Sequence, residues 1–173
     1  LDELPDEPRE PVMLPSPRHT TAHRVYSWLR PQEFAAIHFQ DWQGNGAICA
    51  RAKHTGRAFA ETLLTVTAHG SSEWIREGMG EFPSSGRESL IDDALERTAV
   101  ELADVLICPS HYMRAWLRER GWRLPEVVEE APYLFPKNET RASGALAPGE
   151  LREIVFFGRL ETRKGLLPFL DAL

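Results

Sequence analysis

Short apolar runs alternate along the chain with segments whose apolar positions recur every three to four residues. Five runs predict strands, because each is brief and rich in aliphatic or aromatic residues: "EFAAIHF", "TLLTVTA", "DVLICP", "EVVEE" and "EIVFF". Helices are predicted between and after them, at "GAICARAKH", "SSEWIREG", "HYMRAWLRERG" and "KGLLPFLDAL". Alternating strands and helices are typical of an α/β fold, a parallel sheet with helices on both faces.

The helix before "DVLICP" has the clearest local signals. Ser89 starts a capping-box pattern with Asp92, and a loop is expected at 78–88. Apolar or small residues then form one stripe of a 3.6-residue period, at positions 90, 91, 94, 95, 98, 99, 102 and 103. Ser110 is the expected cap of the next helix, which ends at Gly121.

Composition divides the chain into four parts. Residues 1–24 form a proline-rich arm or linker, of which residues 1–19 are expected to be extended, and residues 25–135 hold the first four strands. Residues 136–152 have the composition of a hinge linker, and residues 153–173 begin a second unit. We expect "FAAIHF", "LLTVTA" and "VLICP" to be neighbouring central strands of one parallel sheet.

Bulk composition excludes several classes of protein. A hydrophobic fraction of 42% supports a packed core, and the net charge of −6 argues against a nucleic-acid-binding protein. The sequence has no apolar run of the roughly 20 residues that a membrane span needs, and it lacks a signal-peptide pattern. Cys49 and Cys108 each lie in an apolar stretch, which predicts two reduced core thiols and a cytoplasmic protein.

Polar residues follow several of the predicted strands, where parallel α/β sheets bind their ligands. Arg159, Arg163 and Lys164 lie where the last strand turns towards a helix, so cations and free backbone N–H groups gather there. Such a turn suits a diphosphate, but on charge alone a solvated turn without a ligand is favoured. Asp41 and His69 follow consecutive strands, which favours a functional site over two loop-capping residues.

The segment "VFFGRLETRKG" with its leucine-rich helix resembles the nucleotide-binding entry to the C-terminal domain of retaining GT-B glycosyltransferases. More narrowly, the segment is similar to family 4, glycosyl transferases group 1, in its glycogen-synthase-like branch. Gly158, Arg159 and Lys164 match the family's motif, in which the Arg and the Lys hold the diphosphate of a nucleotide-sugar. Upstream, "ELADVLICPSHYMRAWLRERGW" resembles an element of the family's N-terminal domain.

Two further segments resemble this family at the ends of the strands. "TVTAHG" is similar to a Thr-x-His-Asn pattern, which maps its histidine to His69, with Gly70 in place of the Asn. "IHFQDWQ" is similar to a His-x-His-Asp-Trp segment, and His38, Asp41 and Trp42 match it. Gln40 replaces the second His, and both departures put a glycogen-type acceptor in doubt.

The resemblance implies a Rossmann-like N-terminal domain and sugar transfer from a nucleotide-sugar to a carbohydrate or lipid-linked acceptor, with retention of configuration. It implies that Arg159 and Lys164 neutralise the diphosphate without a metal or other cofactor. His69 would form a hydrogen bond with the sugar or the acceptor, and Asp41 would help to orient the acceptor. The rival interpretation is a non-catalytic Rossmann-like module that binds a nucleotide or a partner. A nucleotide-sugar epimerase or dehydrogenase is disfavoured because Gly-x-Gly-x-x-Gly is absent.

Compared with the family pattern, the chain corresponds to an internal portion. The resemblance implies a further N-terminal strand with a glycine-rich loop and two C-terminal glutamates, so we expect no sugar transfer by this chain alone. The apolar face of 153–173 would need a cover, either the N-terminal domain or a second copy. We expect a homodimer through this segment, with Phe156 and Leu170 at the contact.

Overall fold

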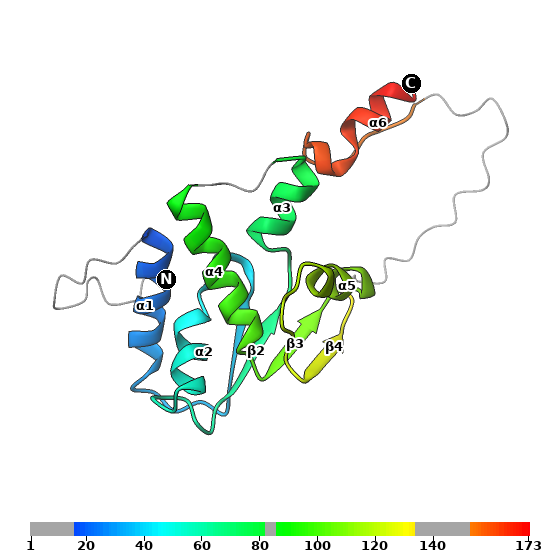
Figure 1. Cartoon of the computed structure of the whole chain (residues 1–173). Coiled ribbons are helices and arrows are strands. Elements are labelled where there is room, and N and C mark those ends of the chain that lie inside the picture. Colours follow the sequence, from blue (N-terminus) through cyan, green and yellow to red (C-terminus); the bar gives the residue numbers. More distant parts are fainter. Residues whose placement is uncertain (1–15, 82–85, 134–152) are drawn as a thin grey trace.

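The computed structural model describes residues 16–81, 86–133 and 153–173 and contains a four-stranded parallel sheet flanked by helices (Figure 1). Its strands are β1 (Ala36–Gln40), β2 (Leu63–Thr67), β3 (Val105–Cys108) and β4 (Val127–Glu130), in that spatial order. The expected parallel α/β fold is therefore confirmed, and the first three strands are neighbours as expected. Among the described residues β1 lies at an edge rather than in the centre.

Residues 16–81 and 86–133 form the main body of the molecule, in which the helices are connected to these strands by loops. They are α1 (Pro17–Leu29), the 3₁₀ turn η1 (Trp42–Gly44), α2 (Ala47–His54), α3 (Ser72–Met79), α4 (Arg87–Glu101) and α5 (His111–Glu119). Ser110 caps α5 as expected, because its hydroxyl accepts a hydrogen bond from Met113 N at 3.2 Å. α4 begins upstream of the expected cap at Ser89, with Gly86 in the capping position. Among the described residues no helix combines the length and apolar character needed to cross a bilayer.

Helix α1 begins inside the segment that was expected to be an extended arm. Ser16 accepts a hydrogen bond from His19 N at 3.1 Å, and Pro17 occupies the first helical position. A proline there costs little, because the first N–H groups of a helix have no partner within the helix. The extended conformation expected up to residue 19 was therefore wrong for residues 17–19, while residues 1–15 and the hinge at 136–152 lie outside the described residues.

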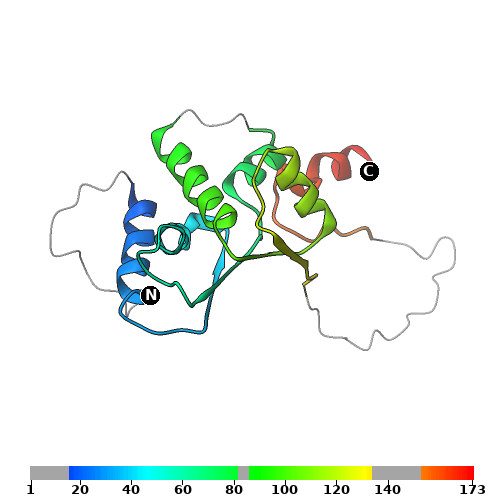
Figure 2. The same ribbon diagram turned by 60° about the horizontal axis from the view of Figure 1, so that its bottom comes forward.

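Helices α1, α2, α4 and α5 pack on one face of the sheet. Leu64, Val66, Leu106 and Cys108 on that face are at most 1% exposed, and they form clusters with residues of four helices, among them Leu29, Cys49, Val100 and Trp116. The opposite face, with His38, Thr65 and Thr67, is only partly covered. Helices were expected on both faces. A strand order equal to the chain order explains the difference, because right-handed crossovers that all step in one direction place their helices on one face (Figure 2).

The two cysteines are part of this core. Cys49 and Cys108 are both buried and form no disulfide, as expected. Burial raises the pKa of the Cys49 thiol to about 12 and that of Cys108 to about 11, so both thiols stay protonated near neutral pH. They therefore act as small apolar side chains rather than as nucleophiles.

The C-terminal segment differs from the expectation of a strand followed by a helix. It contains a 3₁₀ turn η2 (Thr162–Lys164) and α6 (Leu166–Asp171), whereas residues 153–157 form no strand. A strand needs a neighbour for its backbone N–H and C=O groups, and no described strand pairs with this segment. Phe157 is fully exposed, and Phe156 packs on Phe169 with ring centroids 5.4 Å apart. η2 lies against α3, and the homodimer remains a prediction.

A close backbone approach joins the turn after β1 to α4. Gly44 has φ +60°, and a Cβ atom built on it would lie 2.5 Å from Leu95 Cβ and 2.6 Å from the Leu95 carbonyl carbon. Only glycine fits this position, because both the backbone conformation and the available space exclude a side chain. The contact fixes the start of α2 against the middle of α4.

We expect Gly44→Ala to lower the free energy of unfolding by about 2–5 kcal/mol. Left-handed backbone costs alanine about 1–2 kcal/mol, and overpacking adds about 1–3 kcal/mol. Gly56→Ala is the matched control, since Gly56 has φ +67° but nothing within 4 Å of its added Cβ. Urea unfolding of both variants measures the difference. Equal losses of stability in the two variants would contradict the close contact at Gly44.

Candidate functional site

Three polar side chains meet at the carboxyl edge of the sheet. Asp41 follows β1, His69 follows β2 and Tyr133 follows β4. The backbone N–H of His69 donates to Asp41 Oδ1 at 2.8 Å, and the Tyr133 hydroxyl lies 2.8 Å from His69 Nδ1. The rings of His69 and Tyr133 stack, with centroids 5.4 Å apart and planes 17° from parallel. Asp41 and His69 therefore lie at the same edge, as expected.

Asp41 holds the backbone of this edge together. Its carboxylate is only 1% exposed and accepts backbone hydrogen bonds from Trp42 at 2.8 Å, His69 at 2.8 Å and Gly70 at 3.2 Å. Burial raises the pKa of Asp41, although these three hydrogen bonds act in the opposite direction. Its side chain does not open towards solvent beside His69, so Asp41 contacts the loops rather than the surface where a substrate would lie.

His69 and Tyr133 are the exposed members of the cluster, whereas Asp41 is buried. Nδ1 faces the Tyr133 hydroxyl, and within the described ranges Nε2 has no hydrogen-bond partner. If the Tyr133 hydroxyl donates to Nδ1, the imidazole carries its proton on Nε2 and presents it to solvent. Stacking on Tyr133 restricts the rotation of the ring. The arrangement thus offers one oriented imidazole nitrogen to a hydroxyl or phosphate oxygen.

A second buried carboxylate lies next to this cluster. Glu96 on α4 is 1% exposed and accepts hydrogen bonds from Gln43 N at 2.9 Å, Ser72 N at 2.7 Å and Ser72 Oγ at 2.8 Å. Burial raises the pKa of Glu96 to about 7, the nearby charge of Asp41 adds to this effect, and the hydrogen bonds oppose it. Glu96 thereby connects the turn after β1, the first turn of α3 and the middle of α4.

The sequence interpretation missed Glu96 and Tyr133. Glu96 directly follows Leu95, a residue of the apolar stripe of its helix. An acidic residue so close to the buried side of a helix was the signal that the sequence offered. Tyr133 lies in the exit loop of the last strand of this sheet, where the rule that ligands bind at carboxyl ends applies. The contact between Tyr133 and His69 joins residues far apart in the chain, so sequence patterns do not reveal it.

The side chains of His38 and Trp42, which match the family segment, lie outside the cluster of Asp41, His69 and Tyr133. His38 is on the open face of the sheet, where its two ring nitrogens lie 2.8 Å from Thr65 Oγ1 and 3.2 Å from Thr67 Oγ1. Trp42 is 47% exposed, and the guanidinium of Arg18 lies 5.9 Å from its ring centroid. Neither side chain makes a hydrogen bond to Asp41 or His69 in the part of the chain that the structure describes.

The expected diphosphate residues are in the C-terminal segment. The Arg159 side chain is 71% exposed and forms an ion pair with Glu161 at 2.9 Å, and Lys164 is exposed. Gly158 precedes them in an exposed loop. Across the described ranges no hydrogen bond or ion pair connects these three residues to His69 or Asp41. The structure therefore brings Asp41 and His69 together and leaves Gly158, Arg159 and Lys164 apart from them.

Arg163, the remaining cation of this turn, packs on α3. Its side chain is only 13% exposed, its guanidinium lies 5.9 Å from the centroid of Trp74, and Nε donates to Glu161 Oε2 at 2.8 Å. A Cβ added to Gly78 would lie 3.2 Å from Arg163 Cβ, so the glycine permits this approach. Figure 1 shows η2 and α6 beyond the C-terminal end of α3. Arg163 therefore attaches the turn to the main body.

We expect stability to fall as the pH rises from about 4.5 to about 7 because of Glu96. A carboxyl group whose pKa is higher in the folded chain stabilises the fold when it is protonated. Its contribution to the free energy of unfolding is therefore complete below the ordinary pKa of 4.5 and is lost as the pH rises to about 7. The shift corresponds to about 3 kcal/mol. Urea unfolding across this range should show a decline in wild type that Glu96→Gln lacks. Parallel pH profiles for the two proteins would contradict the assignment.

We expect Gly78→Leu to release residues 161–170 from α3. A leucine side chain would occupy the space now filled by Arg163, and replacing glycine favours the helix itself, so α3 should persist. Hydrogen exchange of residues 161–170 should become faster in Gly78→Leu and in Arg163→Ala. Arg118→Ala, on the exposed surface of α5, is the control and should leave the exchange rate of residues 161–170 unchanged. Unaltered exchange in the first two variants would show that α3 does not hold the turn.

Comparison with known proteins connects this geometry to a family. The family model described as "Glycosyl transferase 4-like domain" matches residues 3–129, which include the whole sheet except the last residue of β4. No curated protein and no solved structure matches the chain. The matched part contains Asp41, His69 and Glu96, whereas Tyr133 and the cationic turn lie beyond it. The chain belongs to the glycosyl transferase 4-like domain family.

Proposed function

We propose that this protein serves the transfer of a sugar from a nucleotide-sugar to an acceptor hydroxyl, with retention of configuration. Family membership supports a glycosyltransferase. The observation that carries the proposal is the exposed imidazole of His69, held at the carboxyl edge of the sheet by Asp41 and Tyr133. Parallel α/β folds bind their ligands at this edge. Its position supports a direct role for His69 in binding the sugar or the acceptor.

His69 would contact the sugar or the acceptor through Nε2. In this proposal Tyr133 orients the ring, and Asp41 fixes the backbone of His69 rather than touching the acceptor itself. An imidazole held in this way can donate to a sugar hydroxyl without losing side-chain entropy on binding. Asp41 is thus proposed as a positioning residue, which modifies the expectation that it orients the acceptor directly.

Arg159 and Lys164 would neutralise the leaving diphosphate. Charge develops on that group as the bond to the sugar breaks, so cations placed there stabilise the transition state without a metal ion. Arg159 now pairs with Glu161, and a diphosphate would replace this carboxylate as its partner. For retention, the acceptor hydroxyl would attack on the face from which the nucleotide departs, and the departing phosphate would take its proton.

The donor half of the proposal predicts how nucleoside diphosphates bind. Isothermal titration with UDP, GDP and ADP should show binding of at least one, weakened about 10-fold or more by Arg159→Gln or Lys164→Gln. The reason is the loss of one charge-assisted hydrogen bond, about 1.5–3 kcal/mol. Glu161→Gln, which removes the competing carboxylate, should bind more tightly than either. If Arg159→Gln, Lys164→Gln and the control Arg118→Gln bind nucleoside diphosphates with equal affinity, the assignment of Arg159 and Lys164 is wrong.

Sugar transfer is tested separately, by incubating the chain with a panel of nucleotide-sugars and acceptors. NMR of the product identifies its anomeric configuration, and an inverted product would exclude retention. Measurable transfer by this chain would contradict the expectation that it transfers no sugar alone, and His69→Ala should reduce such transfer while nucleoside diphosphate affinity remains. Nucleotide binding without turnover agrees with that expectation and also with the rival interpretation, a non-catalytic nucleotide-binding module.

A further inference from the structure

Helices α1 and α2 form a basic surface on an acidic protein. Residues 17–32 and 42–60 contain no Asp or Glu, although the whole chain has a net charge of −6. The two helices contact each other, so their charges share one region of the molecule. The basic or histidine side chains of these two stretches are Arg18, His19, His23, Arg24, Arg30, Arg51, Lys53, His54 and Arg57.

A cavity of about 360 Å³ lies between these helices. His23 and Tyr26 line it from α1, Arg51 and Thr55 from the end of α2, and Arg57 from the loop that follows. Its volume is within the range of small-molecule sites, about 300–1,000 Å³. α2 ends where the chain returns to the amino end of β2, so the cavity is distant from the edge that holds His69.

The cations of this cavity are not compensated by acids. Throughout the described residues Arg51 and Arg57 form no ion pair, whereas Lys53 on the same helix pairs with Asp104 at 2.6 Å. Burial lowers the pKa of the neighbouring His19, and the nearby His23 and Arg51 add to this effect. Nδ1 of His19 is also buried without a hydrogen-bond partner. These observations describe a region of positive potential with unused hydrogen-bond donors.

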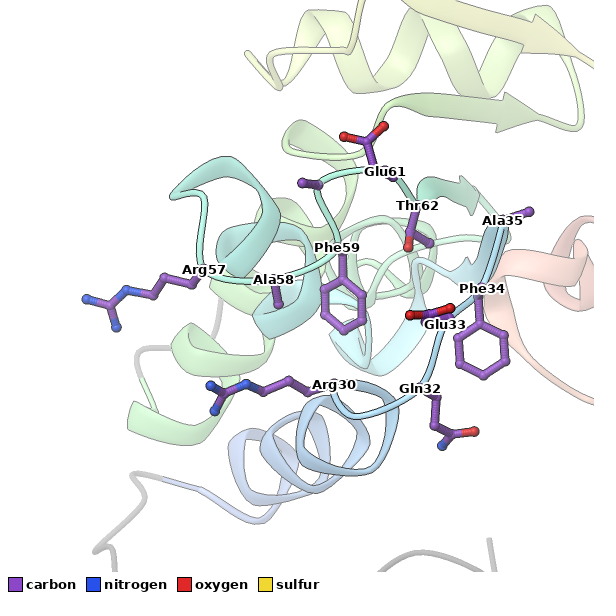
Figure 3. A pocket seen from close by; sticks show the side chains of 11 residues that line it. Arg30, Gln32, Glu33, Phe34, Ala35, Arg57, Ala58, Phe59, Glu61 and Thr62 are labelled. Atoms are coloured by element: carbon purple, nitrogen blue, oxygen red, sulfur yellow. The ribbon is translucent and has the colours of Figure 1, made fainter.

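The neighbouring pocket provides a contrast. It has about 620 Å³, shares Arg57 with the first cavity and is lined by Arg30, Glu33, Glu61 and Thr62 among others. Figure 3 shows Arg30 and Arg57 extending to the same side, away from the carboxylates of Glu33 and Glu61. This second pocket therefore presents both signs of charge. The cavity between α1 and α2, by contrast, combines several cations with no acid in its lining.

We propose that the cavity between α1 and α2 binds a phosphate-bearing anion through Arg51, Arg57 and His23. Arginine can offer two parallel N–H groups to phosphate oxygens, and the Tyr26 hydroxyl lies among the same lining residues. The C-terminal end of α2 carries a partial negative charge, so two arginines are needed to make the site attractive to an anion. The ligand is a soluble phosphate ester or a phospholipid headgroup, which share this chemistry.

Inorganic pyrophosphate is the probe for the site. Isothermal titration uses the chain with Arg159→Gln and Lys164→Gln as background, so that the result does not depend on the proposed donor site. We expect Arg57→Gln or Arg51→Gln to weaken binding about 10-fold or more in this background, whereas Arg118→Gln leaves it unchanged. Arg57 is in an exposed loop, so its variant should fold even if Arg51→Gln does not. Equal binding by Arg57→Gln and Arg118→Gln would overturn the proposal.

Vesicles distinguish the two sources of phosphate. Co-sedimentation with phosphatidylglycerol vesicles, lost in Arg57→Gln and reversed by pyrophosphate, would identify a headgroup as the ligand. Pyrophosphate binding that depends on Arg57, with no binding to these vesicles or to neutral phosphatidylcholine, would identify a soluble ligand. Binding that is independent of Arg57 in both experiments, or no binding in either, would refute the site.

Discussion

Two buried carboxylates at the carboxyl edge of the sheet organise this protein. Asp41 and Glu96 together accept five backbone N–H groups, from Trp42, His69, Gly70, Gln43 and Ser72. Removing a carboxylate from water is unfavourable, and hydrogen bonds from fixed donors offset part of that cost. The loops after β1 and β2, the start of α3 and the middle of α4 are consequently held in one arrangement. His69 takes its position from this network rather than from its own side-chain contacts alone.

This network relates the stability of the fold to its proposed chemistry. Glu96 lies on the helix that also accommodates the close approach of Gly44, so the turn after β1 is fixed from two directions. A change at either point would move the backbone that carries Asp41 and, through it, the N–H of His69. Residues without any contact to a substrate therefore influence the placement of the imidazole.

Much of the main sheet was predictable from the sequence, because its determinants are local. Apolar runs identified the strands, and Ser110 predicted the start of α5. What failed depends on tertiary surroundings. "EIVFF" has the composition of a strand but no described strand to pair with, and prolines suggested an extended arm where Pro17 instead begins a helix. The distribution of helices on one face followed from strand order, which the sequence does not encode locally.

The candidate site was predictable only in part. Positions after strands identified Asp41 and His69, because the carboxyl ends of parallel strands meet at one edge. The burial of Asp41 was not predictable, since it arises from N–H groups supplied by a different loop. Tyr133 and Glu96 acquire their importance through long-range contacts, and the packing of Arg163 on Trp74 joins segments on either side of the 134–152 stretch. These long-range contacts can be identified only from the folded structure.

The strand order has a consequence for how the sheet assembles. Each strand pairs with the one that precedes it in the chain, so every pairing closes a loop of modest length. Short loops carry a smaller entropic penalty than the long closures of sheets in which distant strands are neighbours, and local topology is associated with rapid folding. The main body can therefore grow from one strand–helix–strand unit by adding the next. Within the described ranges the strands β1 and β4 each have a single neighbour, so we expect them to open first when the protein unfolds locally.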